Sequence, residues 1–120
     1  MGHIGMLPQS IKEEGGYKIK GRSDEDRDRL IADARAVEKA GAFAVVVELV
    51  EKETAAVISR SISIPTIGIG SGEGCDGQIL VSHDLFGSFP WFRPKFAVAK
   101  ADVASAMRAA AESFVRDVSG

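Results

Sequence analysis

The sequence has a single cysteine, no long apolar run and almost no charge imbalance. One cysteine, Cys75, cannot form an internal disulfide, so the composition suits a reducing compartment, and we expect the cytoplasm. No stretch approaches the roughly 18 apolar residues that a membrane-spanning helix requires. Lysine and arginine number 15 against 17 acidic residues, and the net charge of −2 gives no electrostatic reason to expect nucleic acid or an acidic membrane as partner.

What the sequence does contain is an alternation of helical and strand patterns. Its 120 residues, 45% hydrophobic and 27% charged, fit one globular domain. Helical spacing, capping residues and apolar runs predict a loop over 1–22, helices over 23–40, 51–61 and 102–118, and strands over 43–47, 66–70 and 78–83. Strands that alternate with helices predict an α/β fold with a parallel sheet and right-handed crossovers.

Glu48 is the first candidate for chemistry, because it directly follows the apolar run Phe43–Val47. Parallel strands place functional residues at their C-terminal ends, in barrels and in open sheets alike. The turn at Gly70 and the pair His83-Asp84 follow the next two predicted strands, so the three segments are expected on one rim. A carboxylate there is either a partly desolvated general base or a solvated acid at a strand end, and the residues alone leave both open.

The glycine-rich segment 70–77, GSGEGCDG, has two interpretations as well. Its spacing is not that of a dinucleotide fingerprint, and no Gly-Lys-Ser/Thr follows as a P-loop requires. The remaining choices are a tight turn that needs positive φ, or a backbone that a ligand approaches closely.

The other reactive side chains give weaker signals. His3 and His83 stand in no metal-binding array, so each is either a ligand or a hydrogen-bonded structural histidine. Cys75 has no base beside it in the sequence. The aromatic residues of 86–96 have few cations among them, which favours packing or a subunit interface over a nucleic-acid platform.

Several segments together resemble one family. GHIGMLPQS, GGYKIKGR, AGAFAVVVE, IPTIGIGSG, CDGQILVSHDLFG and PKFA resemble, in this order and spacing, the ketopantoate hydroxymethyltransferase (3-methyl-2-oxobutanoate hydroxymethyltransferase) family. The match extends to about Phe96, and the last helix matches in kind more than in residues. The resemblance implies a (β/α)8 TIM barrel of the phosphoenolpyruvate/pyruvate-like group, which needs about 250 residues.

The chain resembles the C-terminal half of that barrel, from the end of the family's fifth strand to its eighth, followed by the helix at about 102–118. The implied reaction transfers a hydroxymethyl group from 5,10-methylenetetrahydrofolate to the 2-oxo acid 3-methyl-2-oxobutanoate, with Mg²⁺ as Lewis acid. The resemblance places Glu48 at the proposed general base and His3, Gly70, Ser71 and His83 at the substrate.

The family's magnesium-binding aspartates and substrate lysine lie in the N-terminal half, so the resemblance implies no metal ligand in this chain. Two hypotheses follow for its function. Either it is the C-terminal portion of the transferase, inactive in isolation, or it is a non-catalytic half-barrel that self-associates or pairs with an N-terminal half. Exposed strand edges make a homo-oligomer or such a partner expected in both cases.

Overall fold

The computed structural model describes all 120 residues, and the chain divides into two compact units, Met1–Ile79 and Leu80–Gly120. The first unit contains β1 (Gly2–Gly5), the short 3-10 helix η1 (Pro8–Ser10), α1 (Asp24–Lys39), β2 (Val45–Glu48), α2 (Lys52–Ser61), β3 (Thr66–Ile69) and β4 (Gly77–Gln78). The second contains α3 (Ser82–Phe86) and α4 (Val103–Ser119). The predicted extent of one partial barrel domain over 1–120 stays a prediction.

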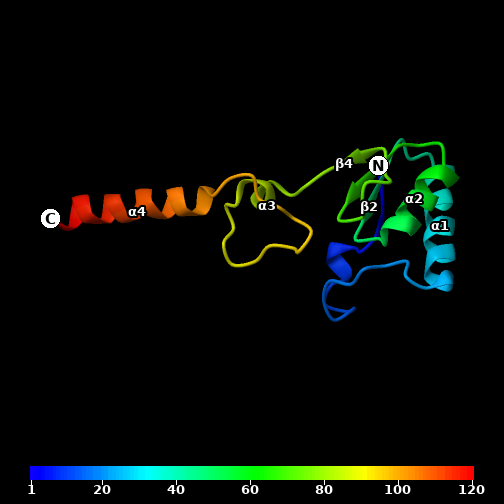
Figure 1. Cartoon of the computed structure of the whole chain (residues 1–120), viewed down its shortest axis with the longest axis horizontal. Coiled ribbons are helices and arrows are strands. Elements are labelled where there is room, and N and C mark those ends of the chain that lie inside the picture. The colour runs from blue at the N-terminus through cyan, green and yellow to red at the C-terminus, as the bar shows by residue number, and fades with distance from the viewer. The chain divides into compact units, whose positions relative to one another are not determined.

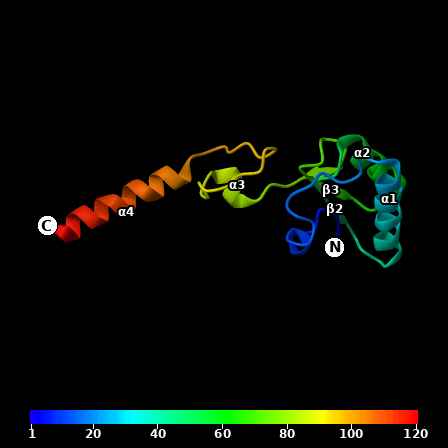
Figure 2. The same cartoon turned by 90° about the horizontal axis from the view of Figure 1, so that it is seen from below.

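The strands of the first unit form one parallel sheet in sequence order. Its strands are ordered β1-β2-β3-β4, and every neighbouring pair is parallel. The helices α1 and α2, which connect the first three strands, lie on the same side of the sheet (Figures 1 and 2). Sequential order with helices on one face is the arrangement of a TIM barrel, whereas a doubly wound sheet carries helices on both faces. The predicted α/β class is confirmed, and the unit is consistent with part of a TIM barrel.

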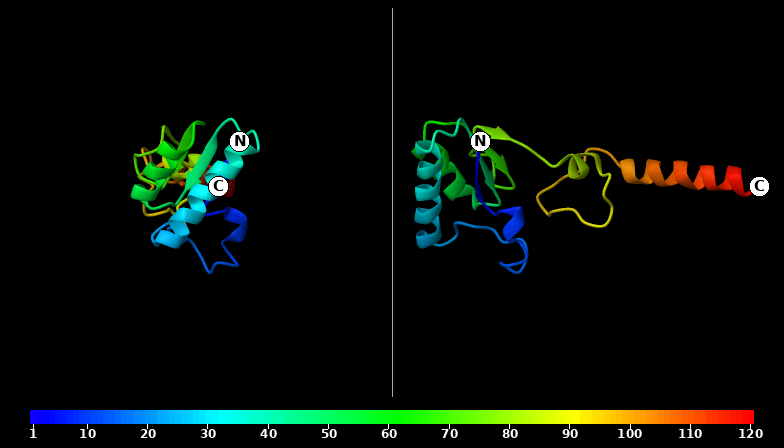
Figure 3. Two further views of the ribbon diagram at one scale, coloured as in Figure 1. Left: turned by 90° about the vertical axis from the view of Figure 1, so that its right-hand side faces the viewer. Right: turned by 180° about the vertical axis from the view of Figure 1, so that it is seen from behind.

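The core lies between the sheet and these two helices, which Figure 3 shows in front of the strands in its left view. It is a single apolar cluster of Ile4, Leu30, Ala34, Val45, Val47, Val50, Ala55 and Ile58. Gly2 allows the close approach of α1, because a Cβ there would stand 2.1 Å from Cγ1 of Val37. One face of the sheet is therefore committed to packing.

Both helices begin as the sequence predicts. The main-chain N–H of Asp26 donates to the Ser23 hydroxyl at 3.1 Å, so Ser23 is the N-cap of α1. The carboxylate of Glu51 accepts from the N–H groups of Glu53 and Thr54 and caps α2 in the same way. These caps fix where each connection leaves the C-terminal edge of the sheet.

Two predicted elements were wrong. The loop predicted over 1–22 from the residues contains β1, a strand too short and too rich in glycine to stand out by periodicity. The resemblance, which implied the end of the family's fifth strand here, agrees with β1. The predicted strand over 78–83 is paired only at Gly77–Gln78, and residues from Ser82 onward form α3. Ile79 and Val81 are 49% and 48% exposed, so their β-branched side chains lack the burial that makes such residues strand formers.

The second unit consists of α3, an irregular segment and α4. Gly87 ends α3 in the left-handed conformation with φ of 62°. The helix α4 corresponds to the predicted helix at 102–118 and buries none of its residues. Neither α4 nor any other helix is long and apolar enough to cross a membrane.

Candidate active site

A histidine and a carboxylate from neighbouring strands form a pair at the C-terminal end of β2. The Nε2 atom of His3 lies 2.9 Å from Oε2 of Glu48. The side chain of Glu48 is 15% exposed and that of His3 is 36% exposed. Because a carboxylate only accepts, the imidazole Nε2–H is the donor when Glu48 is ionised. The other carboxylate oxygen, Oε1, has no hydrogen-bond partner and is free to meet a ligand.

The pleat of the strands explains why these two side chains meet. Successive side chains of a strand point to opposite faces. Ile4 on β1, and Val45 and Val47 on β2, lie in the core beside the helices. His3 and Glu48 therefore point to the opposite face, which in a complete barrel is the interior. In the register His3 pairs with Val46 and Gly5 with Glu48, so the interacting side chains are diagonal neighbours.

The chain makes an unusual turn directly after Glu48. Leu49 has φ of 49° and is the chain's single non-glycine residue with positive φ. Its N–H donates to the carbonyl of Ile69 at 2.9 Å, and its carbonyl accepts from the N–H of Lys20 at 2.8 Å. Nothing in the sequence signals this conformation, since leucine is not a residue that favours it.

Ser71, a predicted substrate ligand, is 1% exposed and bonded to the main chain. Its hydroxyl accepts from the N–H of Val50 at 3.0 Å and donates to the carbonyl of Val47 at 2.8 Å. A substrate would have to compete with both partners. Substrate binding by Ser71 stays a prediction.

Gly70 directly follows β3 and has φ of 63°. Glu48 pairs with Ile69 in the register, so the predicted neighbourhood of Glu48 and Gly70 on one rim is confirmed. The later glycines of the run serve packing. A Cβ at Gly72 would stand 2.6 Å from Cβ of Lys52, and one at Gly74 would stand 2.7 Å from Cβ of Ala56, both on α2. Substrate binding at Gly70 stays a prediction.

The GGYKIKGR block reaches the same edge of the sheet. Lys20 forms an isolated parallel bridge with Val50, and its carbonyl accepts from the N–H of Glu51 at 2.8 Å. Its ammonium pairs with Glu14. The buried hydroxyl of Thr54 donates to the carbonyl of Gly21 at 2.8 Å and anchors the end of the block. Residue patterns did not predict that this segment attaches to the sheet. The signal that could have indicated it is the GGYKIKGR block itself.

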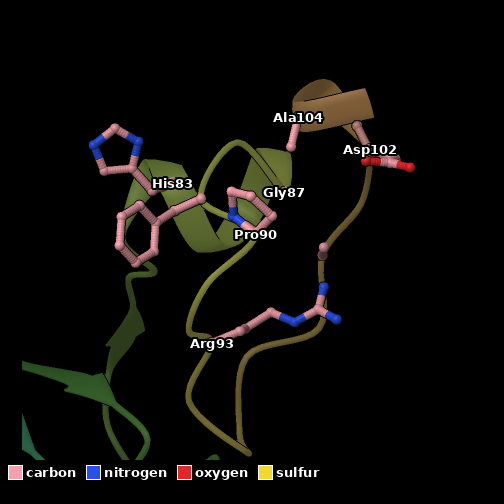
Figure 4. Close-up of a pocket in the computed structure, with 9 residues that line it drawn as sticks. His83, Gly87, Pro90, Arg93, Asp102 and Ala104 are labelled. Atoms are coloured by element: carbon pink, nitrogen blue, oxygen red, sulfur yellow. The ribbon is translucent and has the colours of Figure 1, made fainter. Parts of the chain in front are cut away.

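His83 lies in the second unit, on α3, so the predicted strand end at this position was wrong. Its Nδ1 atom lies 2.9 Å from the Ser88 hydroxyl. It lines a cavity of about 450 Å³ within this unit, together with Arg93 and Asp102. In Figure 4 the imidazole points away from the Asp102 carboxylate, so these two form no acid–base pair. Substrate binding by His83 stays a prediction.

The acidic residues do not assemble into a metal site. No group of three or more His, Cys, Asp or Glu side chains in the chain is placed to hold a metal ion. Asp76 binds at the start of β3, where its carboxylate accepts from the N–H and the hydroxyl of Thr66 at 2.8 and 2.9 Å. These hydrogen bonds, the main-chain one first, hold the pKa of Asp76 below its usual value. The residues of this chain do not by themselves fit a magnesium site.

Comparison with known proteins identifies the family of the chain. A family model described as ketopantoate hydroxymethyltransferase matches residues 1–120. The chain belongs to the ketopantoate hydroxymethyltransferase family. It is 51% identical over 118 residues to a protein of Cenarchaeum symbiosum named 3-methyl-2-oxobutanoate hydroxymethyltransferase, covering 98% of the chain and 45% of that protein.

Two further relatives carry the same name. The protein of Mesorhizobium japonicum is 56% identical over 118 residues, covering 98% of this chain and 41% of the relative. The protein of Thermotoga maritima is 49% identical over 118 residues, covering 98% and 44%. The chain thus spans less than half the length of these family members.

Proposed function

We propose that this chain supplies the general base and part of the 2-oxo acid site of a 3-methyl-2-oxobutanoate hydroxymethyltransferase. The observation that carries the proposal is the pair of His3 on β1 and Glu48 at the C-terminal end of β2, on the face of the sheet turned away from the helices. TIM-barrel enzymes act at that end. The names of relatives at about half identity support the reaction class.

In this proposal the free Oε1 of Glu48 takes the proton from carbon 3 of 3-methyl-2-oxobutanoate. The C–H electron pair becomes the enolate, whose carbon 3 then forms a bond to the methylene carbon of 5,10-methylenetetrahydrofolate. As that bond forms, one of the two carbon–nitrogen bonds of the methylene carbon breaks. Water supplies the hydroxyl group as the second carbon–nitrogen bond breaks. One folate nitrogen takes the proton held by Glu48 and the other takes the remaining proton of water, so tetrahydrofolate leaves. The low exposure of Glu48 favours the step, because a base beside a carbon acid works best where water is scarce.

His3 has the role of orienting the base. Its Nε2–H donates to Oε2 and so presents Oε1 to the substrate. The backbone at Gly70, which has no Cβ, allows the 2-oxo acid to approach the same edge. Within the first unit, the proposed substrate contacts are His3 and Gly70.

The folate, the Mg²⁺ ion and the remaining substrate contacts are assigned in this proposal to a second polypeptide or further sequence corresponding to the rest of the relatives' length. No step above depends on a metal ligand from this chain. The proposed compartment is the cytoplasm, and the proposed assembly is a homo-oligomer or a complex with an N-terminal half.

The test is reconstitution. The chain is mixed with a separately made polypeptide corresponding to the N-terminal half of a relative, and hydroxymethyl transfer is assayed with Mg²⁺ present. Activity that requires both polypeptides supports the proposal. Turnover by this chain alone contradicts the division of the site, and an inactive mixture of two associated, folded halves contradicts the reaction.

A second candidate is a non-catalytic half-barrel. β1 is an edge strand that pairs only with β2, and within the first unit the helices α1 and α2 pack on the face opposite to His3 and Glu48. Unpaired strand edges favour association with another chain. Light scattering separates the candidates: a stable homo-oligomer that excludes the second polypeptide favours this one, and a mixed complex favours the transferase.

A further inference from the structure

The turn that follows Glu48 is conformationally strained. Leu49 has φ of 49°, where an L-residue with a branched side chain is disfavoured. The side chain of Leu49 is only 8% exposed, so the residue is not in a loose surface loop. Strain of this kind persists only where the surroundings hold the backbone in place.

The surroundings are a set of hydrogen bonds to consecutive main-chain groups. The carbonyl of Glu48 accepts from Met6, the N–H of Leu49 donates to Ile69, and the carbonyl of Leu49 accepts from Lys20. Each of these three uses a main-chain partner, so side-chain substitution leaves them in place.

The remaining restraint comes from one side chain. The Ser71 hydroxyl accepts from the N–H of Val50 at 3.0 Å and donates to the carbonyl of Val47 at 2.8 Å. It therefore bridges the residues on either side of Glu48 and Leu49. With 1% exposure, neither bond is replaced by water when the hydroxyl is removed.

We propose that Ser71 is a positioning residue for Glu48: its hydroxyl holds Leu49 in the left-handed conformation and thereby keeps the carboxylate against Nε2 of His3. The direction of the Glu48 side chain depends on its own backbone, which continues directly into the strained peptide. The importance of this role rests on the proposed function, in which Glu48 is the base.

The test uses nitrogen-labelled chain and nuclear magnetic resonance. The chain has two histidines, so the imidazole signals are few, and Glu48→Leu identifies the His3 Nε2–H proton by its loss. Ser71→Ala is compared with Ser59→Ala. Ser59 is a matched control, since its hydroxyl lies 2.7 Å from that of Thr66 at the opposite end of β3.

Ser71→Ala is expected to raise the solvent exchange rate of the His3 Nε2–H proton about tenfold, while Ser59→Ala changes it by less than about twofold. Adding Leu49→Gly to Ser71→Ala restores slow exchange, because glycine adopts positive φ without strain. Adding Leu49→Ala instead does not restore slow exchange, because alanine removes nearly as much of the leucine side chain as glycine does but keeps the strain of positive φ.

An unchanged exchange rate in Ser71→Ala overturns the proposal, as do equal effects of the two serine substitutions. If Ser71→Ala does not fold, the double variant with Leu49→Gly decides: failure of that variant as well means that Ser71 serves general stability. Because no substrate is present, these results are independent of the reconstitution assay. If the reconstituted mixture is inactive while the His3 Nε2–H proton exchanges as expected in the serine variants, that result contradicts the proposed function and leaves the role of Ser71 standing.

Discussion

Gly5 faces Glu48 across the β1–β2 pair at a distance that admits no side chain. A Cβ at Gly5 would stand 2.2 Å from the Glu48 carbonyl oxygen and 2.8 Å from Cγ2 of Val50. The φ of Gly5 is 91°, and the following N–H, of Met6, donates to that same carbonyl at 2.9 Å. The glycine of the GHIG segment thus sets how closely β1 approaches the end of β2.

Replacing Gly5 by alanine should therefore be strongly destabilising. We expect Gly5→Ala to lower the free energy of unfolding by about 3 kcal/mol, because backbone strain and a clash with main-chain atoms add. Gly15→Ala is the control: Gly15 also has positive φ, but a Cβ there would meet no atom within 4 Å. Its expected cost is about 1 kcal/mol. Urea unfolding measures both, and equal costs would show that the close approach to Glu48 is not tight.

Thr54 is expected to hold the GGYKIKGR block on the sheet edge. Thr54→Val keeps the shape of the side chain but leaves the Gly21 carbonyl without its 2.8 Å hydrogen bond, at an expected cost of about 1.5 kcal/mol. Thr54→Ser retains the hydroxyl and is the control. Hydrogen exchange at the Lys20 amide should accelerate in the valine variant only. Equal exchange in both variants would mean that the bridge of Lys20 to β2 does not depend on Thr54.

Asp76 should make stability depend on pH on the acid side. Hydrogen bonds from Thr66 lower its pKa in the folded state below the ordinary value of 3.8. A lowered folded pKa gives stability that is present above the unfolded pKa and is lost as the pH falls through the folded pKa. Asp76→Asn should therefore be less stable than the wild type at neutral pH, and the difference should shrink below about pH 4.

The control for Asp76 is Glu73→Gln, since Glu73 has no hydrogen bond or ion pair in the structure. Unfolding curves at several pH values measure both variants. A constant difference between wild type and Asp76→Asn across the acid range would contradict the assignment.

The chain alone should not bind Mg²⁺ tightly. Glu48 lies at the C-terminal end of β2, whereas the Asp76 carboxylate binds Thr66 at the start of the neighbouring β3, and no three ligand-type side chains cluster. Titration calorimetry of the isolated chain should detect no binding at micromolar Mg²⁺, and Glu48→Gln should not alter the trace. Micromolar affinity that Glu48→Gln abolishes would place a metal ligand at the proposed base.

Much of the fold could be predicted from local signals. Ser23 and the acidic residues after it predicted the start of α1. The apolar run before Glu48 predicted both β2 and the position of its C-terminal end. The strand predicted at 78–83 was wrong beyond its first residues, because an apolar run does not report whether a partner strand is present. The N–H of Ile79 still donates to the carbonyl of Gly68 at 3.0 Å, but β4 ends at Gln78 and Val81 is 48% exposed.

The candidate site could be predicted from the residues only in part. Glu48 stood out because a carboxylate is conspicuous after an apolar run, yet its contact with His3 joins residues 45 positions apart. Such a pair becomes visible only when the register between β1 and β2 is known, and His3 was predicted as a site residue only through the resemblance to a family. No local sequence signal predicts the left-handed conformation of Leu49, because tertiary hydrogen bonds impose it.

The central claim, that Glu48 removes the proton from carbon 3, is tested most directly by deuterium exchange. 3-Methyl-2-oxobutanoate is incubated in D₂O with Mg²⁺ and the two mixed polypeptides, without folate, and loss of the carbon-3 proton signal is followed by nuclear magnetic resonance. The account predicts exchange by the wild-type mixture and a loss of about 10²–10⁴-fold with Glu48→Gln, the usual contribution of a general base. Glu73→Gln should exchange at the wild-type rate. Exchange by the Glu48→Gln mixture at the wild-type rate would contradict the account and assign proton removal to another residue.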